Sequence, residues 1–395
     1  MKIETELLRT AAPEYGRAAL SDVLPSALAL LGDEDSSDVL GLEDRLSGVR
    51  RIAVLLVDGL GYHLLREAAA SSPTLASGLD GTVGSLRRLT TGFPSTTPTS
   101  LTSLGAGVAP GEHGLVGFTV RIPGSDQLLC HIVWGDTPDP AKWQPTPTCF
   151  ERAVKAGISA GVVSSGAFEG TGLTVSAFRG GAYCAADGVE SVAAGMRAAL
   201  SREAPCLVYG YYPFVDKAGH LHGAGSPEWH AAVAGLERLL RLLLADLPAD
   251  AALLVTADHG MINVPDDERI DLADHPRLRD GVRLIAGEPR ARYVHTEPGA
   301  AVDVAAAWRE TLGEHVDVVT RAEALAAGWL GHVVPDAHAA RVGDVVAVCR
   351  GRHVILGVPE CDSATVSLLR GYHGGLTEAE IAIPLWAIRG DALAR

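Results

Sequence analysis

The stretch Ile52-Ala53-Val54-Leu55-Leu56-Val57, followed directly by Asp58-Gly59, decides the fold of this 395-residue chain. Such a continuous apolar run is typical of a strand that is buried on both faces of a parallel sheet. In open α/β sheets, function collects at the carboxyl ends of the strands, and Asp58 stands at one such end. An aspartate in a structural turn explains this single stretch equally well, so the other strands must decide.

Four further apolar runs repeat the pattern, at residues 160–163, 206–212, 252–256 and 381–386. Helical sequences lie between several of these runs. Residues 189–200 have a helical pattern, and Ser226-Pro227 is a typical helix start. The alternation predicts an α/β fold in which helices cover both faces of a mostly parallel central sheet.

Residues 262–370 interrupt this alternation with charged turns, short β-like pieces and a helical segment. Two of the pieces, residues 345–348 and 353–356, suggest a hairpin. We therefore predict a core domain of residues 1–261 and 371–395, with residues 262–370 inserted as a smaller α+β subdomain. Residues 118–147 and 166–185 predict irregular loops beside the functional site, and we expect specificity to reside in these loops and in the insertion.

The formal net charge is −15, from 33 basic and 48 acidic residues, and no basic run stands out. This balance argues against nucleic acid polymers and anionic membranes as partners. The first residues carry acids and lack an apolar signal-peptide core. Six scattered cysteines indicate free thiols. We expect a soluble, cytoplasmic protein, and the sequence leaves its oligomeric state open.

Polar residues with metal-binding side chains gather at the predicted strand ends. These Asp and His residues, together with one threonine, are Asp58, Thr97, Asp216, His220, Asp258, His259 and His373. Aspartate oxygen and imidazole nitrogen suit Zn²⁺, with Mn²⁺ next. Two such ions can flank a phosphoryl group during its transfer. Each piece alone is also explained by an ordinary turn, but their number and placement favour a two-metal site for a small phosphorylated substrate.

Thr97 belongs to a hydroxyl-rich stretch, Phe93-Pro94-Ser95-Thr96-Thr97-Pro98-Thr99-Ser100, that leads into a short predicted helix at residues 101–104. A hydroxyl at a helix start lies near unsatisfied backbone N–H groups, where an oxyanion is stabilised. Without the other residues, a Ser/Thr-rich capping loop is the better explanation. The strand-end Asp and His residues make it the place for a nucleophile.

Five blocks of this sequence resemble the nucleotide pyrophosphatase/phosphodiesterase family of the alkaline phosphatase superfamily. They are Leu56-Val57-Asp58-Gly59, Phe93-Pro94-Ser95-Thr96-Thr97, Asp216-Lys217-Ala218-Gly219-His220, Thr256-Ala257-Asp258-His259-Gly260-Met261 and Tyr372-His373-Gly374. They occur in the family's order and span nearly the whole chain. The resemblance implies an alkaline phosphatase-like α/β sandwich with a mostly parallel sheet.

The resemblance also implies two divalent metal sites, normally zinc. The first ion would bind Asp216, His220 and His373. The second would bind Asp58, Asp258 and His259, together with the Thr97 hydroxyl. Thr97 would attack phosphorus and form a phospho-threonine that water then hydrolyses, with metal coordination in place of a protein base.

Thr97 fits the family pattern Phe-Pro-Ser-x-Thr and its spacing to a later His-Gly pair, here His113-Gly114. Thr96 instead fits a Thr-x-Pro spacing through Pro98 and requires a one-residue shift downstream. The sequence departs from its relatives at Ser100, where they commonly carry an asparagine that helps to hold a phosphate oxygen. This departure leaves the diesterase subclass open.

The leading hypothesis is a metal-dependent phosphodiesterase or nucleotide pyrophosphatase that acts on a small nucleotide-like diester. The alternative keeps the fold and the metals but changes the substrate to a phosphomonoester or a phosphonate. Arylsulfatase and phosphoglycerate mutase are disfavoured because their nucleophile motifs are absent. A binding protein that has lost activity is disfavoured because it has no need of a nucleophile between metals.

Overall fold

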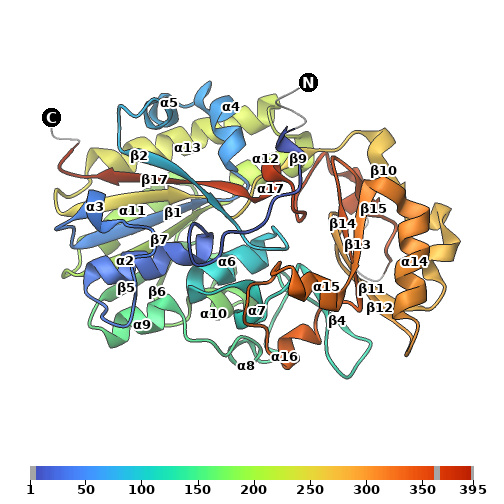
Figure 1. Ribbon diagram of the computed structural model, residues 1–395. Helices are drawn as coiled ribbons and strands as arrows, with labels where there is room; N and C mark the ends of the chain where they lie inside the picture. Colours follow the sequence, from blue (N-terminus) through green and yellow to red (C-terminus); the bar gives the residue numbers. More distant parts are fainter. Residues whose placement is uncertain (1–5, 360–364, 393–395) are drawn as a thin grey trace.

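The computed structural model describes residues 6–359 and 365–392, and its centre is a seven-stranded sheet (Figure 1). The strand order is β2-β17-β8-β1-β7-β5-β6. The strands are β1 Arg51–Val57, β2 Ser85–Thr90, β5 Ser159–Ser164, β6 Ala182–Ala185, β7 Cys206–Tyr212, β8 Ala251–Thr256 and β17 Ala382–Arg389. Only β17 runs antiparallel to its neighbours, β2 and β8, whereas the pairs from β8 to β6 are parallel. The predicted α/β fold with a mostly parallel sheet is confirmed.

Strand β1 lies at the middle of the sheet because it has no polar side to expose. Ile52 pairs with Leu207 of β7 and with Ala252 of β8, so both hydrogen-bonding edges are occupied. All of its residues after Arg51 are buried. The sheet therefore fixes the position of Asp58, the residue that follows the strand.

Helices cover both faces of this sheet, as predicted. Gly210 of β7 faces Met196 of α11 (Val189–Leu200), and a Cβ at residue 210 would lie only 2.2 Å from the Met196 sulfur. The preceding residue, Tyr209, points to the opposite face, where its ring packs on Phe178 of α10 (Gly172–Phe178). The long helix α13 (Pro227–Ala245) packs beside α11, while α2 (Val23–Leu31) and α9 (Cys149–Lys155) pack beside each other.

The insertion is built around a four-stranded antiparallel sheet in the order β11-β12-β14-β13. Its strands are β11 Val282–Glu288, β12 Ala291–Thr296, β13 Val316–Thr320 and β14 Val345–Cys349. Helix α14 (Ala301–Leu312) packs on it through the fully buried Trp308. The predicted hairpin between residues 345–348 and 353–356 is wrong, because β15 (Val354–Leu356) pairs in parallel with β10 (Arg269–Asp271).

The chain leaves and rejoins the core domain through one short antiparallel pair. Strand β9 (Ile262–Asn263) pairs with β16 (Gly371–Tyr372) at the two ends of the insertion. We propose that this pair marks the boundary of a subdomain of residues 262–370.

The segment after α6 (Thr97–Ala106) joins the core domain to the insertion. Its buried residues Val120, Trp134 and Trp143 form one apolar cluster with Leu284 and Tyr293 of the insertion. The indole N–H of Trp143 donates to His131 Nε2 at 3.1 Å. Residues 118–147 are therefore partly an interface and not only the irregular loop that we predicted.

Residues 166–185 were also predicted as a loop but contain α10 and the edge strand β6. The many glycines in this segment favoured the prediction of a loop. At Gly172 a Cβ would lie 2.3 Å from the Trp134 ring, so this glycine permits close packing at the helix start.

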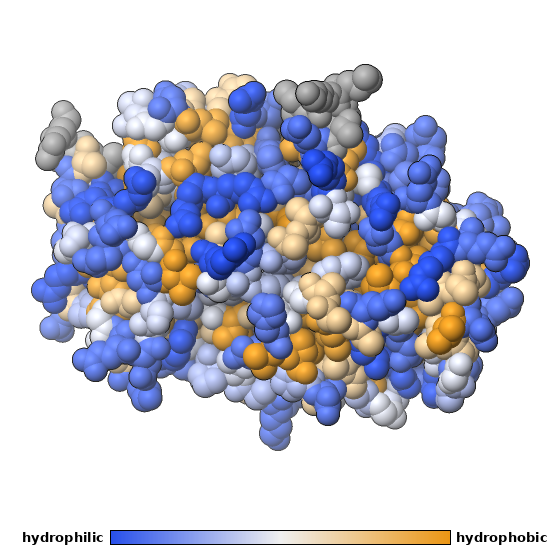
Figure 2. All heavy atoms as spheres, in the orientation of Figure 1, coloured by the Kyte–Doolittle hydropathy of each residue, from blue (hydrophilic) through white to orange (hydrophobic). Residues whose placement is uncertain are grey.

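The surface view in Figure 2 shows mostly hydrophilic residues on one face, with smaller apolar areas between them. No helix in the described part of the chain has the length and apolar character needed to cross a bilayer. The described cysteines, at positions 130, 149, 184, 206 and 349, are free thiols, and Cys361 lies outside the described residues.

Candidate active site

The carboxyl ends of β1, β7 and β8 meet at one edge of the central sheet and bring three aspartates together. Asp58 follows β1, and Asp258 follows β8. Asp216 lies in the first turn of α12 (Phe214–His222), and its N–H donates to the Asp58 carbonyl at 3.0 Å. Gly59 adopts a φ of 73°, and a Cβ there would lie 2.8 Å from Asp216 Cβ. Glycine is therefore required for this close approach.

Three histidines complete the cluster, and the backbone fixes the orientation of each ring. His220 lies one helical turn after Asp216 on α12, and the β9–β16 pair brings His373 beside His259. Each Nδ1 contacts a backbone carbonyl: His220 that of Gly371 at 2.8 Å, His259 that of Gly260 at 3.0 Å and His373 that of Ser95 at 2.9 Å. A carbonyl only accepts, so Nδ1 carries the proton and the Nε2 lone pair faces the centre.

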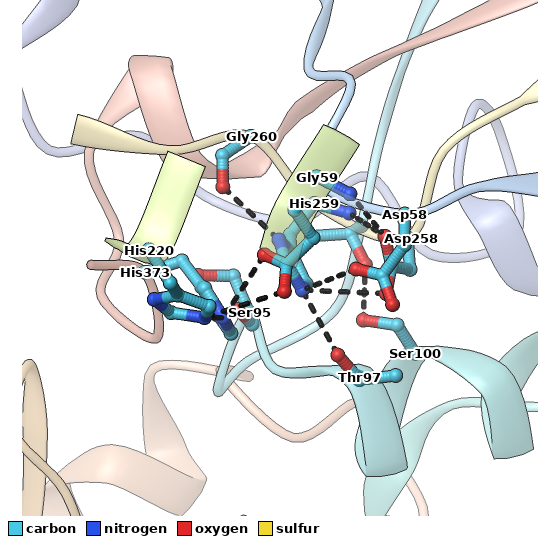
Figure 3. Close-up of polar contacts among 12 residues, drawn as sticks. Asp58, Gly59, Ser95, Thr97, Ser100, His220, Asp258, His259, Gly260 and His373 are labelled. Atoms are coloured by element: carbon cyan, nitrogen blue, oxygen red, sulfur yellow. Dashed lines mark hydrogen bonds and ion pairs between the residues drawn. The ribbon is translucent and has the colours of Figure 1, made fainter. Parts of the chain in front are cut away.

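The structure brings all seven predicted residues into contact. Figure 3 labels six of them, all except Asp216. His259 Nε2 lies 3.2 Å from Thr97 Oγ1, 3.3 Å from Asp258 Oδ2 and 3.6 Å from Asp58 Oδ1. His220 Nε2 lies 3.4 Å from Asp216 Oδ2 and 3.1 Å from His373 Nε2. We call these seven residues the strand-end cluster.

Burial and mutual repulsion dominate the electrostatics of the strand-end cluster. Burial, followed by the charges of Asp258 and Asp216, raises the pKa of Asp58 well above its ordinary value. Burial also raises the pKa of Asp216, although His220 and His259 oppose the shift. Burial and the neighbouring histidines His259 and His220 lower the pKa of His373. Burial thus drives Asp58, Asp216 and His373 toward their neutral forms.

This arrangement fits divalent cations. One oxygen each of Asp58, Asp216 and Asp258 is buried without a hydrogen-bond partner in the described part of the chain. His220 and His373 direct two Nε2 lone pairs at each other, which is unfavourable unless a proton or a cation lies nearby. Asp and His donors of this kind are the ligands that Zn²⁺ prefers.

In each of two sets, the ligand atoms all lie within 4.8 Å of one another. One set is Asp58, Asp258 and His259, and the other is Asp216, His259 and His373. The first set is the predicted second metal site. The other set contains His259 where His220 was predicted, because the His259 ring stacks on His373 with centroids 3.6 Å apart. His220 nevertheless contacts both Asp216 and His373, so the predicted division remains our proposal.

Helix α6 presents the predicted nucleophile at its first residue. Thr96 is the N-cap residue and is fully buried, whereas the Thr97 side chain lies in the adjoining pocket. The hydroxyl beside His259 is therefore that of Thr97. Its position at a helix N-terminus adds a favourable field for negative charge on the oxygen.

Two residues that the sequence analysis compared with the family pattern, Ser100 and His113, lie away from the centre of the strand-end cluster. The Ser100 hydroxyl is fully buried and hydrogen-bonds Thr91 Oγ1 at 2.8 Å, so it is engaged inside the fold. His113 contacts the Ser103 hydroxyl through Nε2 at 2.9 Å and accepts from the Leu115 N–H. The His113 side chain therefore contacts α6 and helps to support this helix.

Sequence reasoning missed Tyr211, whose hydroxyl donates a short hydrogen bond to Asp58 Oδ2. Tyr209 and Tyr211 occupy alternate positions of β7 and both line the adjoining pocket. Alternation along a strand that leads directly to Asp216 was a usable signal, since residues two apart share a face.

Comparisons with solved structures agree on an alkaline phosphatase-like fold. Murine ectonucleotide pyrophosphatase/phosphodiesterase 5, in an inactive form in complex with AMP, matches with a TM-score of 0.67 and 20% identity over 86% of this chain and 88% of that chain. Phosphonoacetate hydrolase from Sinorhizobium meliloti 1021, with phosphonoformate, matches with a TM-score of 0.66 and 21% identity over 87% and 91%. The human pyrophosphatase/phosphodiesterase 5 matches at 17% identity, with a TM-score of 0.66 over 86% and 89%.

Residues 52–375 match the model of the type I phosphodiesterase / nucleotide pyrophosphatase family. The chain belongs to this family, whose members are hydrolases of phosphoester and pyrophosphate bonds. The family resemblance inferred from the five sequence blocks is confirmed. A comparison by sequence found no matching curated protein.

Proposed function

We propose that this protein is a metal-dependent phosphodiesterase or nucleotide pyrophosphatase that cleaves a small phosphodiester through a phosphorylated Thr97. The observation that carries the proposal is the Thr97 hydroxyl, 3.2 Å from His259 Nε2, at the border of two Asp/His ligand sets. A hydroxyl in this position has access both to the buried ligands and to the pocket.

The proposed metal ligands divide into a deep and a shallow set. Asp58, Asp258 and His259 have side chains at most 5% exposed. The shallow set, Asp216, His220 and His373, has side chains that are 15%, 24% and 8% exposed. When bound, two divalent cations, by donor type Zn²⁺ or else Mn²⁺, supply the positive charge that neutralises the carboxylates and stabilises the transferring phosphoryl group.

The chain's own residues position the nucleophile and balance the reaction. The fold holds the Thr97 hydroxyl beside the proposed ligand atom His259 Nε2, and the N-terminus of α6 stabilises negative charge on the Thr97 oxygen. The Thr97 oxygen forms a bond to phosphorus while the bond from phosphorus to one ester oxygen breaks, and that alcohol leaves with a proton. Water then cleaves the phospho-threonine, which regenerates the hydroxyl and releases a phosphomonoester.

The test combines metal analysis with rates on bis-p-nitrophenyl phosphate, p-nitrophenyl phosphate and p-nitrophenyl sulfate. We expect diester preference, about two zinc ions per chain as a two-metal mechanism requires, and a phosphorylated Thr97 peptide after acid quenching. A metal-free, inactive protein contradicts the proposal.

The second candidate is a phosphomonoesterase or phosphonate hydrolase with the same site. The similarity of the fold to phosphonoacetate hydrolase favours it. A higher kcat/KM on p-nitrophenyl phosphate, or release of phosphate from a phosphonate, would replace the leading proposal by this one.

A further inference from the structure

A segment near the start of the chain contacts two loops of the candidate site, although it lies before the part that matches the family model, residues 52–375. We call this segment, residues 9–19, the N-terminal strap. One end of the strap pairs antiparallel with the chain just after His373. There the Ala11 N–H donates to the Leu376 carbonyl at 2.8 Å. The strap therefore supports the loop that carries this proposed metal ligand.

The other end of the strap pairs with the strand that leads to the proposed nucleophile. Thr90, the last residue of β2, donates its N–H to the Ala18 carbonyl at 2.8 Å. The Thr90 hydroxyl accepts from the Glu14 N–H, also at 2.8 Å. We call residues 91–96, which join β2 to α6, the nucleophile loop. The strap thus connects the start of the nucleophile loop with the chain just after His373.

Tyr15, in the middle of the strap, contacts the nucleophile loop directly. Its hydroxyl accepts from the Phe93 N–H at 3.0 Å and donates to the Trp329 carbonyl at 2.8 Å. Burial raises the pKa of Tyr15, so the hydroxyl keeps the proton that it donates. At the neighbouring Gly92, a Cβ would lie 3.1 Å from the Tyr15 oxygen, so the missing side chain leaves room for this contact. The hydroxyl therefore uses both its donor and its acceptor capacity to hold backbone groups.

Three separate parts of the chain meet at this hydroxyl. Besides the strap and the nucleophile loop, they include the insertion, to which Trp329 belongs. The Trp329 ring packs edge-on against Phe93, with centroids 5.2 Å apart. A second anchor of the nucleophile loop is Ser95, whose hydroxyl accepts from the Gly374 N–H at 3.1 Å. The loop is therefore held at two points shortly before Thr97.

We propose that Tyr15 is a positioning residue, which holds the nucleophile loop so that the Thr97 oxygen is aligned with the phosphorus atom. The described residues that line the pocket beside Thr97 do not include Tyr15, so Tyr15 acts through the loop backbone. A displacement of about 1 Å between reacting atoms can lower a rate about 10²-fold. The inference rests on the proposed function of Thr97, and it extends the site to a segment outside the part that matches the family model.

Tyr15→Phe tests this inference because it keeps the ring and removes both hydrogen bonds. On bis-p-nitrophenyl phosphate, we expect kcat to fall at least about tenfold while KM changes less than about twofold. In a single turnover stopped with acid, phosphorylation of Thr97 should slow by the same factor. Zinc affinity, measured by competition with a chelator, should stay at the wild-type value, since the proposed ligands are unchanged.

Tyr293→Phe is the matched control. The buried Tyr293 hydroxyl donates to the Val116 carbonyl at 2.6 Å, so it also joins the insertion to the core domain, but outside the nucleophile loop. We expect a comparable fall in the thermal midpoint of both variants and a loss of kcat in Tyr15→Phe alone. Equal losses of kcat overturn the inference, because Tyr15 then only stabilises the interface.

Hydrogen exchange gives a readout that does not need turnover. The Phe93 N–H loses its acceptor in Tyr15→Phe, so we expect faster exchange in the peptide that covers the nucleophile loop. Exchange in this peptide should be unchanged in Tyr293→Phe. Equal exchange in the wild type and Tyr15→Phe contradicts the inference.

Thr90→Val is a second variant, which leaves Tyr15 intact and removes the hydroxyl that accepts from the Glu14 N–H. We expect a smaller loss of kcat, with KM and zinc affinity unchanged. If Tyr15→Phe does not fold, a wild-type kcat in Thr90→Val overturns the inference. If the wild type forms phospho-Thr97 and Tyr15→Phe retains its kcat, only the inference fails. If the wild type binds no zinc and forms no phospho-threonine, the proposed function fails, and hydrogen exchange still shows whether Tyr15 holds the loop.

Discussion

Two groups of buried charges lie close together in this molecule, and only one of them is balanced. The first is the strand-end cluster, in which Asp58 and Asp258 each leave a buried oxygen without a partner among the described residues. The second is the ion pair between Arg290 and Glu380, both fully buried. Its two hydrogen bonds, at 2.9 Å and 2.6 Å, form a bidentate contact between the insertion and the last part of the chain.

The two groups differ in the hydrogen bonds and the pKa shifts of their carboxyl groups. Glu380 also accepts from the Gly375 N–H and the Thr377 hydroxyl. Burial alone would raise the pKa of Glu380, but Arg290 and these donors together hold it below its ordinary value. In the strand-end cluster, burial and like charges raise the pKa of Asp58 instead. A buried charge whose hydrogen bonds are all formed indicates a structural role. A buried charged group without hydrogen-bond partners indicates a ligand-binding site.

The Arg290–Glu380 pair also supports the loops that carry two of the histidines. The Glu380 carboxylate holds the Gly375 N–H at 2.8 Å, two residues after His373. The Glu380 carbonyl accepts from the Gly260 N–H at 2.7 Å, directly after His259. The balanced pair thus helps to hold the unbalanced cluster in place.

Removal of the nucleophile without any change of charge should give the largest effect. We expect Thr97→Ala to lower kcat by at least about 10³-fold, because no other hydroxyl among the described residues occupies its position. Zinc binding, measured by competition with a chelator, should largely survive. Thr97→Ser is expected to keep part of the activity, and Thr96→Ala is the control. Loss of turnover in Thr96→Ala instead would show that the nucleophile was assigned one residue too late.

Breaking the balanced pair should mainly destabilise the fold. Glu380→Gln leaves the Arg290 charge buried and uncompensated, and we expect a loss of about 3–5 kcal/mol in the free energy of unfolding in urea. The matched control is Glu323→Gln, in the exposed pair with Arg309, for which we expect a much smaller loss because solvent screens the pair. A loss in Glu380→Gln no larger than in the control would refute the architectural role.

The same kind of substitution should have the opposite sign in the strand-end cluster. Asp58→Asn removes a carboxyl group whose charged form is opposed by burial and by the charges of Asp258 and Asp216. Without metal, we expect the free energy of unfolding to rise by about 1–2 kcal/mol, as is common when a functional site is relieved of strain. Zinc affinity should fall in the same variant. A metal-free Asp58→Asn protein that is less stable than the wild type would mean that the cluster is already balanced.

Glu288 is an intermediate case and should produce a pH dependence. It is buried, and desolvation raises its pKa to about 8, although Thr96 and Arg292 oppose the shift. The unfolded chain ionises near 4.5, so folding takes up a proton between about pH 4.5 and 8. The stabilisation is complete below pH 4.5 and is lost as the pH rises toward 8. We expect a contribution of up to about 1.4 kcal/mol per pH unit.

Glu288→Gln should remove this contribution and flatten the unfolding free energy between about pH 5 and 8. Urea titrations of both proteins at several pH values measure it. The exposed acid Glu323, whose pKa is lowered by Thr320, provides a control that leaves this slope unchanged. Parallel curves for wild type and Glu288→Gln would exclude an ionisation of Glu288 in this range.

Predictions from the sequence succeeded where one local pattern was enough. The continuous apolar run of β1 predicted a doubly buried strand, and Ser226 caps α13 by accepting from the Trp229 N–H, as its sequence indicated. The predictions failed where a strand's pairing partner, which the local sequence does not specify, determined the structure. Residues 345–348 and 353–356 have strand-like sequences, but β14 found its partners in β12 and β13.

By itself, the sequence determined the class of fold, the family and the residues of the strand-end cluster. The fold class and the cluster residues follow from apolar runs and from the Asp and His residues at strand ends, which are local properties. The family follows from the resemblance of the five sequence blocks. Tertiary structure alone decided that His259 contacts both ligand sets and that Ser100 is engaged by Thr91. It also decided that the buried Tyr209 hydroxyl has no hydrogen-bond partner among the described residues. These are relations between segments far apart in sequence, and only packing brings such side chains within hydrogen-bonding distance or keeps them out of it.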